Sequence, residues 1–491
     1  MGGMVQDEGS SSVTSSPLQS FSLMSLSPAA QLMSPPVTWL RELKSDERGL
    51  YLIHLLLNCA NHVAAGKLEH ANACLEHISL LAAPDGDTMQ RIASHFTDAL
   101  ARRVLRSWPG LYRALHPPSA AAASRLPPEA LLARRHFFDL CPFVRLAFLV
   151  SNQAILEAME GERVVHVVDL GGAASDAAQW AALLQALRAR PEGPPHLRLT
   201  VVHDQKEFLD VAAMRLSEEA ERLDIPFQFH PVLARLENVD VEMLRVKTGE
   251  ALAISSVLQL HTILAADDDP AVAGHQRKTP SPFTKNSNNV QLHRIAQMSH
   301  RGTLGELLEK DPVNGYSPSP DSATSSPLAS APSPKTESFL ASLWGLSPKI
   351  MTVAEQESNH NGPMLTERFT EALNFYAALF DCLESTAPRM SVERARVEKM
   401  LFGEEIKNII TCEGAERRER HEKLEKWVQR LELAGFGRVP LSYFATLQAR
   451  RLLQGYGCEG YKVREEKGCL FICWQDRPLF SVSAWRFKRF E

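Results

Sequence analysis

One short run of β-branched residues constrains the fold of this chain more than any other feature. Residues 164–168 are all valine except His166. Short runs of this kind are typical of strands buried on both faces of a parallel sheet. The segment that follows, 177–190, carries apolar residues at helical spacing. The two together indicate the start of a strand–helix alternation.

The same alternation repeats along the chain. A helix is predicted over 207–223, and further strands are predicted over 197–202, 226–232, 250–258 and 349–355. Long helices are expected over 392–433 and 441–454, followed by close-set strands at 461–464, 469–474 and 480–485. Strands in this rhythm predict an α/β fold. We expect a Rossmann-like, methyltransferase-like, doubly wound, mostly parallel sheet that ends in antiparallel strands.

The residues before this sheet predict an N-terminal α-helical cap of roughly 110 residues. Leu50, Ile53 and Leu57 lie on one helical face, and Gly66 supplies a stop. Asp87 can cap a second helix that runs to Leu105. The cap should therefore be complete before the first strand begins.

Two segments rich in Ser-Pro steps lack helical or strand periodicity. Residues 1–45 predict a disordered tail, and residues 265–335 predict a disordered insertion. Apolar periodicity resumes on both sides of the second segment, so we expect it to interrupt one domain. The Ser-Pro steps could be sites of proline-directed phosphorylation, or they could simply reflect the usual composition of a disordered segment, and both interpretations stay open.

Composition excludes several classes of protein. The 491 residues include 53 Lys+Arg and 58 Asp+Glu, a net charge of −5, which excludes a polycation that holds nucleic acid by bulk charge. No apolar run is long enough for a membrane span, and the first residues do not form a secretory signal. The eight cysteines include no CxxC pair, which argues for reduced thiols and against a zinc finger.

The end of the first strand carries the candidate ligand loop. Asp169 is followed by Gly171 and Gly172 at the carboxyl edge of the sheet, where open α/β sheets bind ligands. Asp204, at the end of the next strand, could bind a ribose. The loop lacks the further glycines of a cofactor fingerprint, so we favour a degenerate loop in which the aspartate caps the next helix, and expect no cofactor.

A charged segment near residue 420 has three possible interpretations. Arg417, Arg418 and Arg420 alternate with glutamates that would pair at i,i+4 on an exposed helix. We favour a solvated face, then a protein interface, then a DNA-contact stripe. Trp427 is a candidate anchor for a partner.

His54 and His62 could share a helical face but lack further ligands at metal spacing. No metal site and no hydrolase, P-loop or kinase motif is predicted.

Several motifs, in order, resemble those of the GRAS family of plant transcriptional regulators, most closely its scarecrow-like branch. Val165-His166-Val167-Val168-Asp169 is similar to the VHIID motif, and Gln179-Trp180 follows it as in that family. Leu55-Leu56-Leu57-Asn58-Cys59-Ala60 is similar to the first leucine-rich region. Similar matches extend to the PFYRE region near 348–381, the RVER element at 412–427 and the terminal SAW element at 483–485. Ser255 departs from the asparagine that many members carry.

The resemblance implies one GRAS domain over 46–491. Its regions would be leucine-rich region I (46–112), VHIID (131–196), leucine-rich region II (212–246), PFYRE (250–411, including the insertion 265–335) and RVER/SAW (412–491). It also implies a non-enzymatic nuclear coregulator of gibberellin responses and root growth. Implied partners are DELLA repressors, promoter-bound zinc-finger factors of the indeterminate-domain type and other GRAS chains as homo- or heterodimers. DNA contact would be indirect, and no membrane is involved.

Two alternatives stay open. Direct DNA binding through arginines of the cap and of the RVER helix predicts steep salt dependence. An S-adenosylmethionine-binding, methyltransferase-like protein would use Asp169, Gly171 and Asp204.

Overall fold

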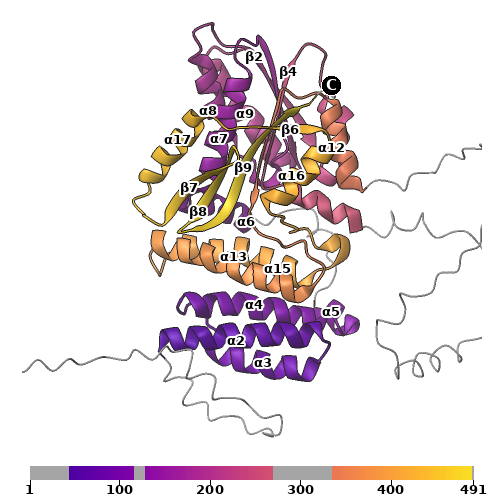
Figure 1. Ribbon diagram of the computed structural model, residues 1–491, viewed down its shortest axis with the longest axis vertical. Helices are drawn as coiled ribbons and strands as arrows, with labels where there is room; N and C mark the ends of the chain where they lie inside the picture. Colours follow the sequence, from indigo (N-terminus) through magenta and orange to yellow (C-terminus); the bar gives the residue numbers. More distant parts are fainter. Residues whose placement is uncertain (1–43, 116–127, 269–333, 489–491) are drawn as a thin grey trace, which may run out of the picture.

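The computed structural model describes residues 44–115, 128–268 and 334–488 (Figure 1). Most of the predicted tail, 1–45, and most of the predicted insertion, 265–335, lie outside these ranges. The described part of the chain begins with α2 (Ser45–Ala64), α3 (Leu68–Leu81), α4 (Thr88–Leu105) and the short α5 (Pro109–Leu115). Two further helices, α6 (Pro128–Leu140) and α7 (Phe143–Ala158), lead into the sheet. Within the described residues no single helix could span a membrane; only the bent pair Glu129–Leu140 and Phe143–Ala158 passes by length and composition.

Strands and helices then alternate, as the hydrophobic pattern predicts. The order is β1 (Val164–Asp169), η3 (Gly172–Ala174), α8 (Ala177–Arg188), β2 (His196–His203), α9 (Lys206–Arg222), β3 (Phe227–Leu233), η4 (Leu236–Asn238), η5 (Val241–Leu244), β4 (Ala251–Val257), η6 (Leu260–Asp268), α12 (Lys335–Gly345) and β5 (Ile350–Gln356). The ends of each strand predicted in this part of the chain lie within one residue of those of an observed strand.

The C-terminal part adds the remaining strands to the sheet. Its elements are α13 (Leu365–Thr386), α14 (Val392–Val397), the π-helical turn η8 (Glu398–Phe402), α15 (Gly403–Thr411), η9 (Gly414–Glu416), α16 (Leu424–Leu433), β6 (Phe436–Val439), α17 (Tyr443–Gln454), β7 (Tyr461–Glu466), β8 (Cys469–Trp474) and β9 (Arg477–Phe487). The predicted continuous helix over 392–433 is wrong, because the chain leaves the helical conformation at Cys412 and does not resume it until Leu424.

The described strands form one sheet in the order β3-β2-β1-β4-β5-β9-β8-β7, with β6 also paired to β9. The five strands from β3 to β5 are parallel, and β9, β8, β7 and β6 are antiparallel to their neighbours. The predicted α/β class, parallel core and antiparallel finish are confirmed. The sheet is more evenly mixed than predicted, because β6 adds a fourth antiparallel pairing.

Alternate residues of β1 bury the two faces of the sheet in separate cores. Val165 and Val167 join one cluster with α7, α8 and α13, whereas Val168 and Leu170 join another with α12 and α16. Figure 1 shows helices on both faces of the sheet. The period-two alternation of a strand explains this division, since successive side chains point to opposite faces.

The helical cap packs lengthwise against α13 and α15 at one end of the sheet (Figure 1). In Figure 1, α13 and α15 lie between the sheet and the cap helices α2, α3 and α4. Asp87 caps α4 by accepting a hydrogen bond from the backbone N–H of Gln90 at 3.0 Å, as predicted. Buried Arg91 of α4 donates to Glu398 of η8 at 3.0 Å and to Glu384 of α13 at 2.6 Å. A buried ion-pair network therefore joins the cap to the rest of the domain.

The chain on either side of residues 269–333 returns to the same place. Asp267, near the end of η6, accepts hydrogen bonds from the backbone N–H of Thr336 at 3.0 Å and from its hydroxyl at 2.8 Å. Strands β4 and β5, which flank this part of the sequence, are parallel neighbours. The described residues on the two sides of 269–333 therefore belong to one sheet domain.

Candidate functional site

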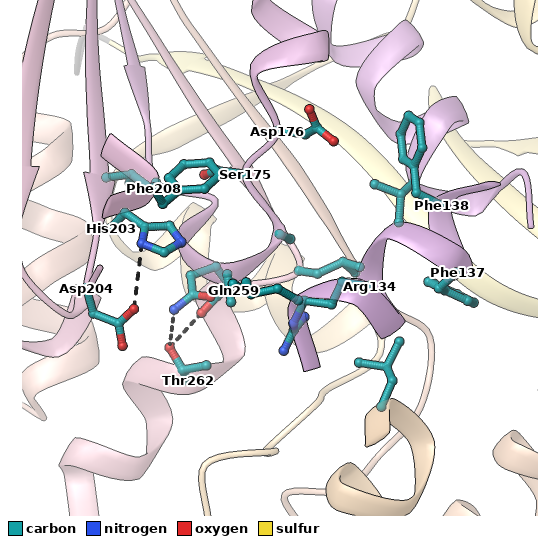
Figure 2. Close-up of a pocket in the computed structure, with 18 of the residues that line it drawn as sticks. Arg134, Phe137, Phe138, Ser175, Asp176, His203, Asp204, Phe208, Gln259 and Thr262 are labelled. Atoms are coloured by element: carbon teal, nitrogen blue, oxygen red, sulfur yellow. Dashed lines mark hydrogen bonds and ion pairs between the residues drawn. The ribbon is translucent and has the colours of Figure 1, made fainter. Parts of the chain in front are cut away.

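A cavity of about 680 Å³ lies at the carboxyl ends of β1, β2 and β4. Its wall combines the loop after β1, the end of β2, helices α6 and α9, and the turn after β4 (Figure 2). Phe137, Phe138 and Phe208 supply aromatic surface, and Arg134, Arg215 and Arg235 supply positive charge. The cavity occupies the edge where open α/β sheets bind ligands.

Asp169 lies beneath the cavity rather than on its wall. Its Oδ1 accepts a hydrogen bond from the backbone N–H of Gly171 at 2.7 Å, and its Oδ2 accepts one from Nε1 of Trp180 at 2.8 Å. Burial raises the pKa of Asp169 and these hydrogen bonds act against that rise. The predicted backbone cap of α8 is supplied instead by Asp176, which accepts from the N–H of Ala178.

Neither glycine of the loop has room for a Cβ atom, because neighbouring side chains of this protein occupy the space. A Cβ on Gly171 would lie 2.8 Å from Oδ1 of Asp169 and 2.9 Å from Oγ of Ser175. Gly172 has φ +48°, and a Cβ there would lie 2.7 Å from the side chain of Gln259. The space that a fingerprint glycine leaves for a phosphate is therefore filled by protein atoms in this loop.

Asp204 does reach the cavity wall, as the strand-end prediction requires. Figure 2 shows its carboxylate turned toward His203, and the two side chains lie 3.7 Å apart. Its second oxygen lies 3.7 Å from Nε of Arg235. The structure thus brings Gly172 and Asp204 to one cavity, but leaves Asp169 and Gly171 below it.

Sequence reasoning missed the residues of α6 and of the turn after β4. Leu258 has φ +51°, a conformation that costs a non-glycine residue energy, and it redirects the chain so that Gln259 and Thr262 face the cavity. Arg134 also lies on the wall, and its buried Nε has no hydrogen-bond partner among the described residues. No local motif marks these positions, since only the fold brings α6 beside the strand ends.

The charged segment that follows η9 is not an exposed helix. Arg417 and Arg420 are each 3% exposed, and His421 is fully buried. Arg420 donates to the carbonyl oxygens of Arg417 and Gly414 at 2.8 Å, and Arg417 donates to the carbonyl of His360 at 2.7 Å. The predicted solvated face is therefore wrong. The two arginines donate hydrogen bonds to backbone carbonyl oxygens in loops, where no regular helix supplies a donor for those oxygens.

The other predicted contact residues are also engaged within the molecule. Arg418 lies on the cavity wall and pairs with Glu237 through both ends of its guanidinium, at 2.8 and 3.1 Å. Trp427 is 1% exposed and packs in the core with Trp485. Trp474 and Trp485 are buried as expected. Three of the four predicted contact side chains thus point away from solvent.

The cap arginines considered for DNA contact face the C-terminal half. Arg103 donates to the carbonyl of Ile410 at 2.7 Å, and Arg106 donates to the carbonyl of Thr411 at 3.0 Å. Each also pairs with a glutamate, Glu413 or Glu416. These two arginines hold the C-terminal end of α15 against the cap. Positive side chains are favourable at this position because the C-terminal end of a helix carries a partial negative charge.

Comparison with known proteins places this architecture in a family. The family model described as the GRAS domain family matches residues 52–486. Scarecrow-like protein 3 of Arabidopsis thaliana is 61% identical over 487 residues, covering 99% of both chains. The GRAS family protein TF80 of Medicago truncatula is 48% identical and covers 92% of this chain and 99% of its own.

More distant relatives and a solved structure agree. The DELLA protein RGL1 of Arabidopsis thaliana is 33% identical over 91% of this chain and 72% of its own. The crystal structure of SCL7 from Oryza sativa matches with a TM-score of 0.64 at 29% identity, over 89% of this chain and 99% of that one. The described sheet, the helical cap and the match over nearly the whole chain lead to one conclusion: this chain belongs to the GRAS domain family.

Proposed function

We propose that the chain is a nuclear coregulator of transcription in gibberellin signalling and root growth, and that it acts without catalysing a reaction. The end-to-end identity of 61% with Scarecrow-like protein 3 carries this proposal. Relatives among the DELLA proteins support the same signalling context. The proposed partners are DELLA repressors, promoter-bound zinc-finger factors of the indeterminate-domain type, and other GRAS chains.

The packing of the β1 loop supports the non-enzymatic part of the proposal. Gln259 fills the space above Gly172, and the carboxylate of Asp169 is buried against Trp180. A methyltransferase needs both positions for its cofactor. The loop here instead stabilises the junction between β1 and α8.

Exposed apolar surface on the cap supports the proposal that the chain acts by binding other proteins. Trp108 is 47% exposed, Leu111 49% and Leu115 58%. Their spacing of three and four residues along and just before α5 puts them on one face. A few large apolar anchors of this kind dominate the binding energy of many protein interfaces. Trp108 replaces the buried Trp427 as the anchor that we propose for a partner.

A fluorescence anisotropy titration tests the adaptor function. The purified chain is added to a labelled promoter duplex at two salt concentrations, with and without an indeterminate-domain zinc-finger protein already bound. We expect an anisotropy increase only when the zinc-finger protein is present, and a smaller one for Trp108→Ala than for the control Tyr443→Ala, at an aromatic residue that is 73% exposed and lies outside α5. Salt-sensitive binding by the chain alone would overturn the indirect mode and favour direct DNA recognition.

Calorimetry with S-adenosylmethionine tests the methyltransferase-like alternative. The filled loop predicts no heat of binding up to millimolar ligand. Micromolar affinity that Asp204→Ala abolishes would contradict the non-enzymatic proposal.

A further inference from the structure

A cluster of histidines and a glutamate contributes to the wall of the cavity. His261 of η6, Glu419 and His421 each offer one ligand atom, and these atoms lie within 4.8 Å of one another. All three residues contribute to the cavity wall. His421 is fully buried and His261 is 3% exposed, while the Glu419 side chain is 24% exposed. Two imidazoles and a carboxylate are ligands that zinc and other divalent transition metals prefer.

The distances within the cluster suit one shared ion. Nε2 of His261 lies 3.2 Å from Oε2 of Glu419, and Nε2 of His421 lies 3.4 Å from the same oxygen. Ligands about 2.0–2.2 Å from a tetrahedral zinc are separated by roughly these distances. Only small movements would therefore place a cation between the three atoms.

Glu355 holds His261 in the orientation that a metal ligand needs. Its Oε1 accepts hydrogen bonds from the backbone N–H groups of Gln259, Leu260 and His261 at 3.1, 2.7 and 3.4 Å. Its Oε2 lies 2.7 Å from Nδ1 of His261. A carboxylate on Nδ1 keeps one proton there and directs Nε2 at Glu419, which is the usual arrangement around metal-ligating histidines. A metal at Nε2 would replace the proton that Nε2 shares with Oε2 of Glu419.

His421 has a comparable support and an unused nitrogen. Its Nδ1 lies 2.9 Å from Nδ1 of His360, whose Nε2 lies 2.9 Å from the hydroxyl of Ser358. Nε2 of His421 is buried and makes no hydrogen bond among the described residues, although Oε2 of Glu419 faces it at 3.4 Å. An unpartnered buried polar atom costs free energy unless something binds it. When His360 accepts the Nδ1 proton of His421, this unpartnered Nε2 carries a lone pair.

From these contacts we propose that His261, Glu419 and His421 form a zinc-binding site, with Glu355 and His360 as supporting residues and the fourth position open to the cavity. Metal binding would release the proton shared by His261 and Glu419, and the two carboxylates of Glu355 and Glu419 would then neutralise a divalent ion bound by two neutral imidazoles. The site joins η6, the end of β5 and the segment after η9. It is independent of the transcriptional function proposed above.

The first experiment measures zinc binding by the full chain. Chelator-treated protein is titrated with zinc by calorimetry, and the bound metal is counted by elemental analysis. We expect one zinc ion per chain at micromolar free zinc. Glu419→Gln and His421→Gln should each weaken binding at least about tenfold, and Glu355→Gln should weaken it about 10–100-fold. Absence of binding at micromolar zinc would overturn the proposal.

A matched control separates this site from surface histidines. His62 and His70 lie on the cap with ring centroids 5.2 Å apart, so the double variant His62→Gln/His70→Gln removes the surface pair. This variant should bind zinc as the unmodified chain does. Loss of binding here, with retention in Glu419→Gln, would refute the assignment. Glu419 is partly exposed, so its variant keeps the test valid even where His421→Gln fails to fold.

Cobalt substitution identifies the ligand atoms. A site built from imidazole and carboxylate should give visible ligand-field bands without a sulfur-to-cobalt charge-transfer band in the near ultraviolet. A strong charge-transfer band would assign the metal to the cysteines and contradict the proposal.

Discussion

The indole Nε1 of Trp180 donates a hydrogen bond to Oδ2 of Asp169 across 2.8 Å, and both side chains are 2% exposed. The contact ties the first helix behind the sheet to the end of its first strand. It also explains why the strand-end aspartate has no free oxygen directed at the cavity.

Trp180→Phe removes this donor and should lower the free energy of unfolding. The orphaned carboxylate oxygen costs about 1–3 kcal/mol. Urea denaturation measures the change, with Trp108→Phe, at a residue 47% exposed, as a control that should show little effect. In a double-mutant cycle with Asp169→Asn the two changes should be non-additive by roughly 1 kcal/mol. Additive losses would mean that the contact contributes nothing.

Gly171→Ala tests whether the loop glycine serves packing. The new Cβ would lie 2.8 Å from the hydrogen-bonded carboxylate of Asp169, so we expect destabilisation of about 1–3 kcal/mol. Gly345→Ala is the control, because its Cβ meets no atom within 4 Å and its φ is not positive. Thermal or urea unfolding compares the two. Equal stability of both variants would contradict the packing role of Gly171.

Arg420→Met should destabilise the fold more than Arg418→Met. Arg420 is 3% exposed, and its loss leaves the carbonyl oxygen of Arg417 without a donor, which costs about 1–3 kcal/mol. The carbonyl oxygen of Gly414 would keep the backbone N–H of Arg417 as its donor. The Arg418 side chain is 32% exposed and its pair with Glu237 should contribute roughly 0–1 kcal/mol. Urea midpoints measure both. The reverse order would restore Arg420 as a surface contact residue.

His95 should contribute to acid destabilisation of the junction between the cap and the sheet domain. Burial and the charge of Lys407 lower the pKa of His95 from 6.5 to about 4. Between about pH 6.5 and 4, His95 therefore binds a proton in the unfolded chain but not in the folded chain. The free energy of unfolding should fall as pH drops from about 6.5 to 4, by at most roughly 1.4 kcal/mol per pH unit from this group.

The variant His95→Gln isolates this contribution. Its unfolding free energy should depend less steeply on pH between 6.5 and 4 than that of the unmodified chain, whereas the exposed-site control His54→Gln should keep the full slope. Burial also lowers the pKa of His166 to about 4, so part of the slope remains in every variant. An unchanged slope in His95→Gln would show that His95 protonates freely in the folded state.

Local sequence was sufficient for most of the elements. The valines of β1, the stop at Gly66 and the cap at Asp87 act through contacts within a few residues, or through burial that any parallel sheet provides. The parallel core, the antiparallel finish and the helical cap were therefore predictable. The ordered motifs of the GRAS family were readable for the same reason, since they are short and continuous.

The segment after η9 shows where such reasoning fails. Glu419 and Glu422 have the spacing of an exposed helix with Lys423 and Lys426, yet Glu419 lies 3.2 Å from His261 and Glu422 binds Arg430. The local i,i+4 pairs contribute only a few tenths of a kcal/mol each. Buried hydrogen bonds to charged groups contribute more, and they determine the conformation here.

The sequence by itself thus determined the fold class, the cap and the strand-end aspartates, because periodicity and capping are local properties of the chain. Only the tertiary structure decided that Asp169 is sealed by Trp180, that Gln259 fills the loop at Gly172, and that His261, Glu419 and His421 meet. The long-range contacts among these join residues that are 11 to 160 positions apart, from Asp169–Trp180 to His261–His421. Their geometry depends on the order of the strands and on which helix covers each strand end, and no spacing along the chain encodes that order.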